Sequence, residues 1–101
     1  MATKPTIIWD KEAKKTYLKT LEYLAKEFSL QSAENLIEAI EQATERIRDY
    51  PTSFRQSSID PNVRFILVGR NRRLYYHFGG NTIRIIFLFD TRQDPNKDPY
   101  Q

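Results

Sequence analysis

The chain has 101 residues, of which 40% are hydrophobic and 29% are charged, and it carries a formal net charge of +3 without any cysteine. This length predicts one domain over residues 1–101, and the lack of cysteine excludes disulfides and thiolate chemistry. Because there is also only one histidine, we expect neither a metal site nor a cofactor. No apolar signal region opens the chain and no apolar run is long enough to span a membrane, so we expect a cytoplasmic protein without a membrane partner.

The first half of the sequence predicts a strand followed by a helical hairpin. The β-rich run Thr6–Trp9 is the expected strand, and Asp10 stands where its carboxylate could cap the next helix. Spacings of three and four residues give that helix one apolar face, formed by Ala13, Tyr17, Leu21, Leu24 and Phe28. Ser29 is the expected N-cap of a second helix from about Gln31 to Asp49, which Pro51 must end. Its apolar face consists of Ala33, Leu36, Ile40, Ala43, Ile47 and Tyr50.

The second half predicts an antiparallel group of strands. After a loop in which Phe54 and Ile59 are expected to turn inward, three strand patterns follow at Val63–Val68, Arg73–Phe78 and Thr82–Phe89. The turns between them, Gly69-Arg70-Asn71 and Gly79-Gly80-Asn81, contain residues that tolerate positive φ. Residues 90–101 form a polar tail that we expect to fray. The predicted fold is α+β in the order βααβββ, with the helical hairpin packed on one face of a small, mostly antiparallel sheet.

Side-chain alternation predicts which residues face away from the helices. In the middle strand, Leu74, Tyr76 and Phe78 are expected to face the core, which leaves Arg73, Tyr75 and His77 on the open face. Strict alternation divides the last strand into two sets, Ile83, Ile85, Phe87 and Phe89 against Arg84, Ile86 and Leu88. Because both sets are largely apolar, this strand should lie inside the sheet. We expect Arg84 and Arg64 to join Arg73 on the open face.

Positive charge is concentrated in the second half. Five arginines and no acidic residue lie between Pro61 and Phe89, which indicates a nucleic acid or an acidic protein segment as the partner. Arginine binds phosphate, tyrosine stacks on unpaired bases, and tyrosine or histidine can transfer the protons of a metal-independent RNA cleavage. The alternative is that Tyr75 packs under the tail and that His77 is an ordinary edge residue. The candidate binding residues are Arg64, Arg70, Arg72 and Arg84.

Several features together resemble the RelE/ParE superfamily of bacterial toxins. They are the βααβββ order, Trp9 at the end of the first strand, Pro51 after the second helix, the Arg-Leu-Tyr-Tyr run at 73–76 and the Asp-Thr-Arg-Gln-Asp-Pro ending at 90–95. The resemblance implies a growth-inhibiting toxin of a type II toxin–antitoxin system, of the kind that stabilises plasmids. It also implies a cognate antitoxin as partner, with operator DNA contacted only through that antitoxin.

The superfamily contains two mechanisms. ParE-like members inhibit DNA gyrase, and RelE-like members cut mRNA on the ribosome. For a RelE-like ribonuclease the resemblance implies Arg73 and Arg92 at the phosphate and Arg64 on the RNA, with protons handled by Tyr75, His77 or Tyr100. Ile66, however, stands where a second basic residue is expected. We therefore favour the ParE-like gyrase inhibitor, with the ribosome-dependent endonuclease and an inactive toxin-like binding module as alternatives.

Overall fold

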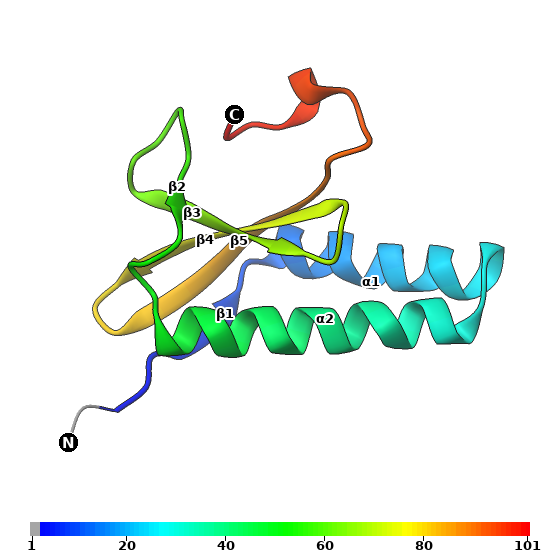
Figure 1. The fold of residues 1–101 in the computed structure, drawn as a ribbon, viewed down its shortest axis with the longest axis horizontal. Helices are drawn as coiled ribbons and strands as arrows, with labels where there is room; N and C mark the ends of the chain where they lie inside the picture. Colours follow the sequence, from blue (N-terminus) through cyan, green and yellow to red (C-terminus); the bar gives the residue numbers. More distant parts are fainter. Residues whose placement is uncertain (1–2) are drawn as a thin grey trace.

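A computed structural model describes residues 3–101 (Figure 1). The elements in chain order are β1 (Thr6–Trp9), α1 (Lys11–Glu27), α2 (Leu30–Asp49), β2 (Arg55–Gln56), β3 (Val63–Val68), β4 (Arg72–Gly79), β5 (Thr82–Asp90) and the 3₁₀ turn η1 (Pro95–Lys97). The predicted βααβββ order is confirmed, and the sequence patterns missed only the two-residue β2 and η1. Within the described range, neither helix is apolar enough over a sufficient length to cross a membrane.

The five strands form one sheet in the order β1-β5-β4-β3-β2. β1 runs parallel to β5, and every other neighbouring pair is antiparallel. The two helices form a hairpin that lies along one face of the sheet (Figure 1). This is the predicted α+β architecture, and β5 lies inside the sheet, between β1 and β4, as its two apolar faces indicated.

The helix boundaries follow local capping chemistry, with one exception. Ser29 caps α2, because its Oγ accepts a hydrogen bond of 3.0 Å from the backbone N–H of Ser32, and α2 ends just before Pro51. Asp10 occupies the N-cap position of α1, but its carboxylate makes no capping bond. It pairs instead with Arg84 of β5, with 3.0 Å between Oδ1 and Nη1. The predicted capping bond is therefore wrong, because the carboxylate turns to a nearby guanidinium.

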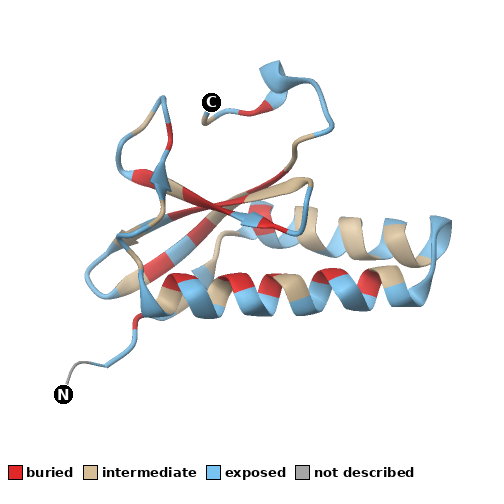
Figure 2. Cartoon of the chain, in the orientation of Figure 1, coloured by how far each residue is buried: buried red, intermediate tan, exposed pale blue. Residues whose placement is uncertain are grey.

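The main core lies between the helices and the sheet. All five predicted core positions of α2 from Ala33 to Ile47 are buried, and Figure 2 shows them as a row of red segments along the helix. Three other predictions of burial are wrong: Phe28 is 66% exposed, Tyr50 63% and Ile59 60%. Phe28 lies at the hairpin tip, which extends beyond the sheet in Figure 1, and Tyr50 follows the last residue of α2. Phe54 does pack against the core, as predicted.

A β-bulge in β5 changes which of its side chains reach the helices. Tyr75 pairs with Phe87 but the next residue, Tyr76, pairs with Ile85, so Ile86 has no opposite residue. The extra residue shifts the alternation, and Leu88 joins Ile83 and Ile85 in the main core. Phe87 and Phe89 consequently lie on the open face. The strict alternation predicted for this strand is therefore wrong beyond Ile85.

The two hairpin turns use the residues that the sequence indicated. Gly69 has φ of +61° before β4, and Gly80 and Asn81 have φ of +57° and +59° between β4 and β5. Successive left-handed residues of this kind match the twist of a tight hairpin. The turns place Arg70 and Asn71 at one end of the sheet and His77 toward the other.

Candidate binding surface

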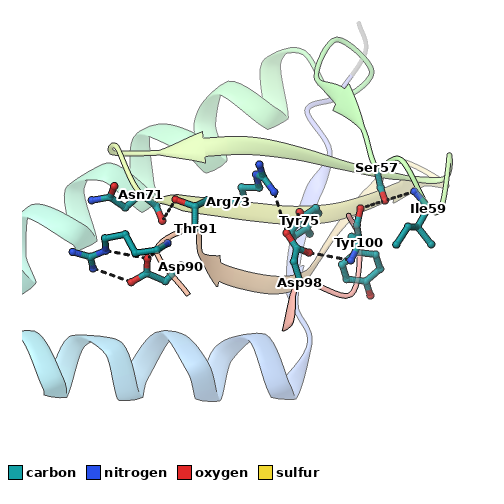
Figure 3. Close-up of polar contacts among 10 residues, drawn as sticks. Ser57, Ile59, Asn71, Arg73, Tyr75, Asp90, Thr91, Asp98 and Tyr100 are labelled. Carbon is teal, nitrogen blue, oxygen red and sulfur yellow. Dashed lines mark hydrogen bonds and ion pairs between the residues drawn. The ribbon is translucent and has the colours of Figure 1, made fainter. Parts of the chain in front are cut away.

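The C-terminal tail is held against the open face of the sheet by a buried carboxylate. Asp98 Oδ2 accepts hydrogen bonds from the Tyr75 hydroxyl at 2.6 Å and from Arg73 Nη1 at 3.1 Å (Figure 3). The Asp98 side chain is only 1% exposed, whereas that of Arg73 is 28% exposed. We call these three residues the clasp. It joins the middle strand to the tail through a charge-assisted contact.

A second contact fixes the end of the tail. The Tyr100 ring lies 5.0 Å from the Tyr75 ring, centroid to centroid, and the backbone carbonyl of Tyr100 accepts a hydrogen bond from the Ser57 hydroxyl (Figure 3). A small second core forms under the tail from Val63, Phe65, Tyr75 and Phe89. The tail is therefore packed, and the prediction that it frays is wrong. The alternative reading of Tyr75, as a residue that packs under the tail, is confirmed.

The clasp alters the acid–base properties of its members. Burial, reinforced by the hydrogen bond to Asp98, raises the pKa of Tyr75 to about 12, although Arg73 opposes the shift. For Arg73, burial lowers the pKa, but the contacts with Tyr75 and Asp98 outweigh burial and leave the pKa raised. Tyr75 therefore keeps its proton, and Arg73 its charge, throughout the physiological range. A phenol that holds its proton so firmly is poorly suited to act as a general base near neutral pH.

The raised pKa of Tyr75 predicts a measurable alkaline transition. Because the folded pKa of about 12 lies above the ordinary tyrosine value of 10.0, the stabilisation from neutral Tyr75 is complete below about pH 10 and is lost as the pH rises to about 12. A spectrophotometric titration of the folded protein should show a late-ionising group of tyrosines. Tyr76 belongs to this group as well, because burial raises its pKa to about 12. Tyr75→Phe should remove one of the tyrosines that ionise only near pH 12. An unchanged absorbance change in that pH range would contradict the raised pKa of Tyr75.

The residues proposed for ribonuclease chemistry do not converge. Arg73, Tyr75 and Tyr100 lie together, but as structural contacts of the docked tail. Arg92 is 60% exposed and pairs with Asp90, with 2.8 Å between Nη2 and Oδ2. His77 lies on the exposed surface four residues along β4 from Arg73, a separation of about 13 Å at the usual rise of a strand.

Two of the predicted binding arginines, Arg64 and Arg84, are already engaged in contacts within the chain. Arg64 lies opposite Tyr76, a residue of the main core, and its Nη1 donates to the backbone carbonyl of Phe54 at 2.7 Å. It therefore faces the helix layer, and the prediction that it lies on the open face is wrong. Arg84 is opposite His77 on the open face, as predicted, and there it pairs with Asp10.

The remaining arginines gather at one end of the sheet, beside α1. The backbone carbonyl of Asn71 accepts from the N–H of Thr91 at 2.6 Å, so the turn that carries Arg70 lies next to the segment that carries Arg92 (Figure 3). Between this end of the sheet, α1 and the tail is a groove of about 580 Å³, and its charged lining consists of Lys19, Arg72, Asp90, Arg92 and Lys97. We call this groove, together with Arg70, the basic end. Four cations and one anion give the groove an excess of positive charge.

Arg72 is the innermost cation of the basic end. Burial lowers its pKa, and Arg92 adds to the effect while Asp90 opposes it. Tyr23 of α1 and the strand residues Phe87 and Phe89 provide aromatic surface in the same groove. An arginine-rich groove with aromatic walls can bind an acidic segment that also carries apolar side chains. Sequence reasoning missed Lys19, Tyr23 and Lys97, although the four-residue spacing of Lys19 and Tyr23 places them on one side of a helix.

A comparison with models of protein families shows to which family the chain belongs. Residues 7–95 match the model of a family described as the ParE toxin of the type II toxin–antitoxin system parDE. The chain belongs to the ParE toxin family. It is therefore the toxin component of a type II toxin–antitoxin system, as its resemblance to the RelE/ParE superfamily implied.

Solved structures support the same fold. This ParE-family chain is similar to a chain of the chromosomal ParDE TA system from P. aeruginosa, with a TM-score of 0.71 and 14% sequence identity. The match covers 85% of the present chain and 95% of the other. The comparison with curated proteins finds no match. At this low identity the structural likeness concerns the arrangement of helices and strands, so the contents of the clasp and of the basic end are properties of this sequence.

Proposed function

We propose that this ParE-family toxin inhibits growth by binding DNA gyrase, and that a cognate antitoxin neutralises it. The observation that carries the choice is the clasp. Arg73 and Tyr75, which a RelE-like ribonuclease would need free to act on RNA, are both bound to the buried carboxylate of Asp98. A protein that acts by binding needs an accessible surface rather than a free acid–base pair, and the basic end provides one.

The basic end is the part of the surface that we assign to the target. Its arginines and lysines suit an acidic protein surface or the DNA held by gyrase, and Tyr23 and Phe87 add apolar contact. A basic surface also accelerates association with a negatively charged partner. The antitoxin, in this proposal, supplies acidic and apolar side chains that compete for the toxin surface.

Controlled expression of the chain alone tests the proposed function. We expect growth arrest with chromosomal breaks and intact mRNA, together with inhibition of DNA supercoiling when the purified chain is added to gyrase. Codon-phased mRNA cuts without DNA damage would instead establish the ribosome-dependent endonuclease. Normal growth with the folded chain present would indicate an inactive binding module.

Paired substitutions locate the binding surface. Arg70→Ala combined with Arg92→Ala removes two exposed cations from the basic end, and we expect at least about a tenfold rise in the concentration needed to inhibit supercoiling, equivalent to about 1.4 kcal/mol of binding free energy. Arg55→Ala is the control for loss of an exposed arginine elsewhere, because Arg55 lies on β2 at the opposite edge of the sheet, and Arg70→Ala and Arg92→Ala measured singly match it in charge. Equal inhibition by the double variant and by Arg55→Ala would exclude the basic end as the target surface.

A further inference from the structure

The outer edge of β1 is an open strand edge without charged residues. β1 is the first strand of the sheet, and no other strand of residues 3–101 pairs with its outer side. Proteins commonly protect such edges with charged residues, proline or a bulge. β1 consists of Thr6, Ile7, Ile8 and Trp9, without charge or irregularity. The edge is therefore suited to pairing with another strand.

The backbone groups that face outward can be identified. The N–H of Thr6 donates to Asn81 and that of Asp10 donates to Ile85, so even-numbered residues of β1 turn their backbone groups toward β5. Because these groups alternate along a strand, Ile7 and Trp9 turn their N–H and C=O groups outward. Their side chains point to the main core, whereas Ile8 lies on the open face of the sheet and is 45% exposed.

We infer that β1 pairs antiparallel with β1 of a second copy of this chain, about a two-fold axis at Ile8, and joins two sheets into one. In this register Ile7 lies opposite Trp9 of the second copy, and each such pair exchanges two backbone hydrogen bonds. Ile8 lies opposite Ile8 of the second copy, as a close apolar pair on the open face. An interface of this kind uses the same patch on both copies and closes as a dimer.

The structure excludes the neighbouring symmetric registers. Centring the axis on Ile7 would place Trp9 opposite Pro5, which has no N–H, and whose carbonyl already accepts from Arg48 Nε at 3.1 Å. Centring it on Trp9 would place Ile7 opposite Lys11, which belongs to α1. Only the register centred on Ile8 satisfies the outward groups of both Ile7 and Trp9.

The surface beside the edge is also compatible with a second copy. A groove of about 610 Å³ runs along the helix side of β1, with Ile7, Trp9, Tyr17, Leu18 and Ile40 as its apolar lining. Its charged lining is one cation, Lys14, and one anion, Glu41. Opposite charges in equal number can pair across a two-fold axis, whereas the basic end would repel a second copy of itself. The paired edges are short, so we expect a dimer that depends on concentration.

Cysteine substitution tests the register directly, because the chain has no cysteine of its own. At a close antiparallel pair the Cα atoms lie about 4.5 Å apart, within disulfide range, so Ile8→Cys should form a covalent dimer under mild oxidation. Thr6→Cys is the matched control: it is exposed and on the same strand, but the two copies of residue 6 would lie about 13 Å apart. We expect the first variant to cross-link at least about tenfold faster than the second.

Sedimentation equilibrium provides a second readout that needs no cross-link. The mass of the unmodified chain should rise toward that of a dimer with concentration, and Ile8→Lys, which places two like charges opposite each other, should keep it monomeric. Circular dichroism of Ile8→Lys is the control for folding, and we expect an unchanged spectrum because Ile8 is 45% exposed. A monomeric mass at every concentration, or equal cross-linking of the two cysteine variants, would overturn the inference. The edge of β1 would then be free to pair with an extended segment of another protein. Neither result depends on toxicity or on gyrase.

Discussion

Replacing Asp98 with alanine is expected to lower the free energy of unfolding by about 3 kcal/mol, because it leaves Arg73 and Tyr75 without their shared partner. The Asp98 side chain is almost fully buried, and removal of one member of a buried charged pair leaves the charge of the other member without a partner. Arg73 retains some contact with solvent, which places the expected loss at the lower end of the range for such pairs. For a chain of this length the change corresponds to a fall in Tm of roughly 12–24 °C.

Urea unfolding followed by circular dichroism measures the loss, and trypsin reports where it occurs. Cleavage after Lys97, which directly precedes Asp98, should become much faster in the variant because the tail is no longer held. Asp98→Asn keeps an oxygen acceptor but removes the charge. Its free energy of unfolding should lie between those of Asp98→Ala and the unmodified chain.

Asp94→Ala is the matched control for the clasp. Asp94 is also in the tail, but it is exposed and its carboxylate accepts only the N–H of Asn96, at 2.9 Å. Its loss should cost about 1 kcal/mol or less, as for an ordinary capping residue. If Asp94→Ala and Asp98→Ala destabilise the chain equally, the tail is not held by the clasp.

Ile47→Ala should lower the free energy of unfolding by about 2–5 kcal/mol, since it creates a cavity where α2 packs on the sheet. Ile47 is 0% exposed and belongs to the main core, together with Leu74 and Ile83 of the sheet. The surrounding strands are fixed by their hydrogen bonds and can close the space only in part. Ile47→Val, which removes one methyl group, should cost about 0.5–1.5 kcal/mol.

The same helix offers a matched control for this substitution. Ile37→Ala makes the same chemical change in α2, but Ile37 is 38% exposed and lies outside the buried row. We expect it to cost less than about 1 kcal/mol, and urea unfolding compares the two variants directly. Equal losses at the two positions would mean that α2 is not oriented as described.

Much of the fold could be predicted because it depends on neighbours in the chain. The apolar spacing in α2, the Ser29 cap and the stop at Pro51 are local features, and all three agree with the structure. The alternation of β4 also placed Leu74, Tyr76 and Phe78 on the helix side. Strict alternation failed in β5, because a bulge is set by the pairing of two strands and leaves no clear mark in either sequence.

The candidate site was much harder to predict than the fold. The sequence showed where positive charge is concentrated, but not which arginines are already bound. Arg73 meets Asp98 at a separation of 25 residues, and Arg84 meets Asp10 at 74. The sequence predicts Arg64 on the open face, since no local pattern indicates that the side chain turns toward Phe54.

The sequence by itself therefore determined the helical hairpin, the antiparallel strands and the family, because periodicity, capping and turn residues act over a few neighbouring positions. Only the tertiary structure decided that the tail covers the open face, that Asp98 binds Arg73 and Tyr75, and that the cations of the basic end collect beside α1. These outcomes depend on which distant charges come within hydrogen-bond range after folding. A buried carboxylate must be hydrogen-bonded, and its partners are the groups that packing places beside it.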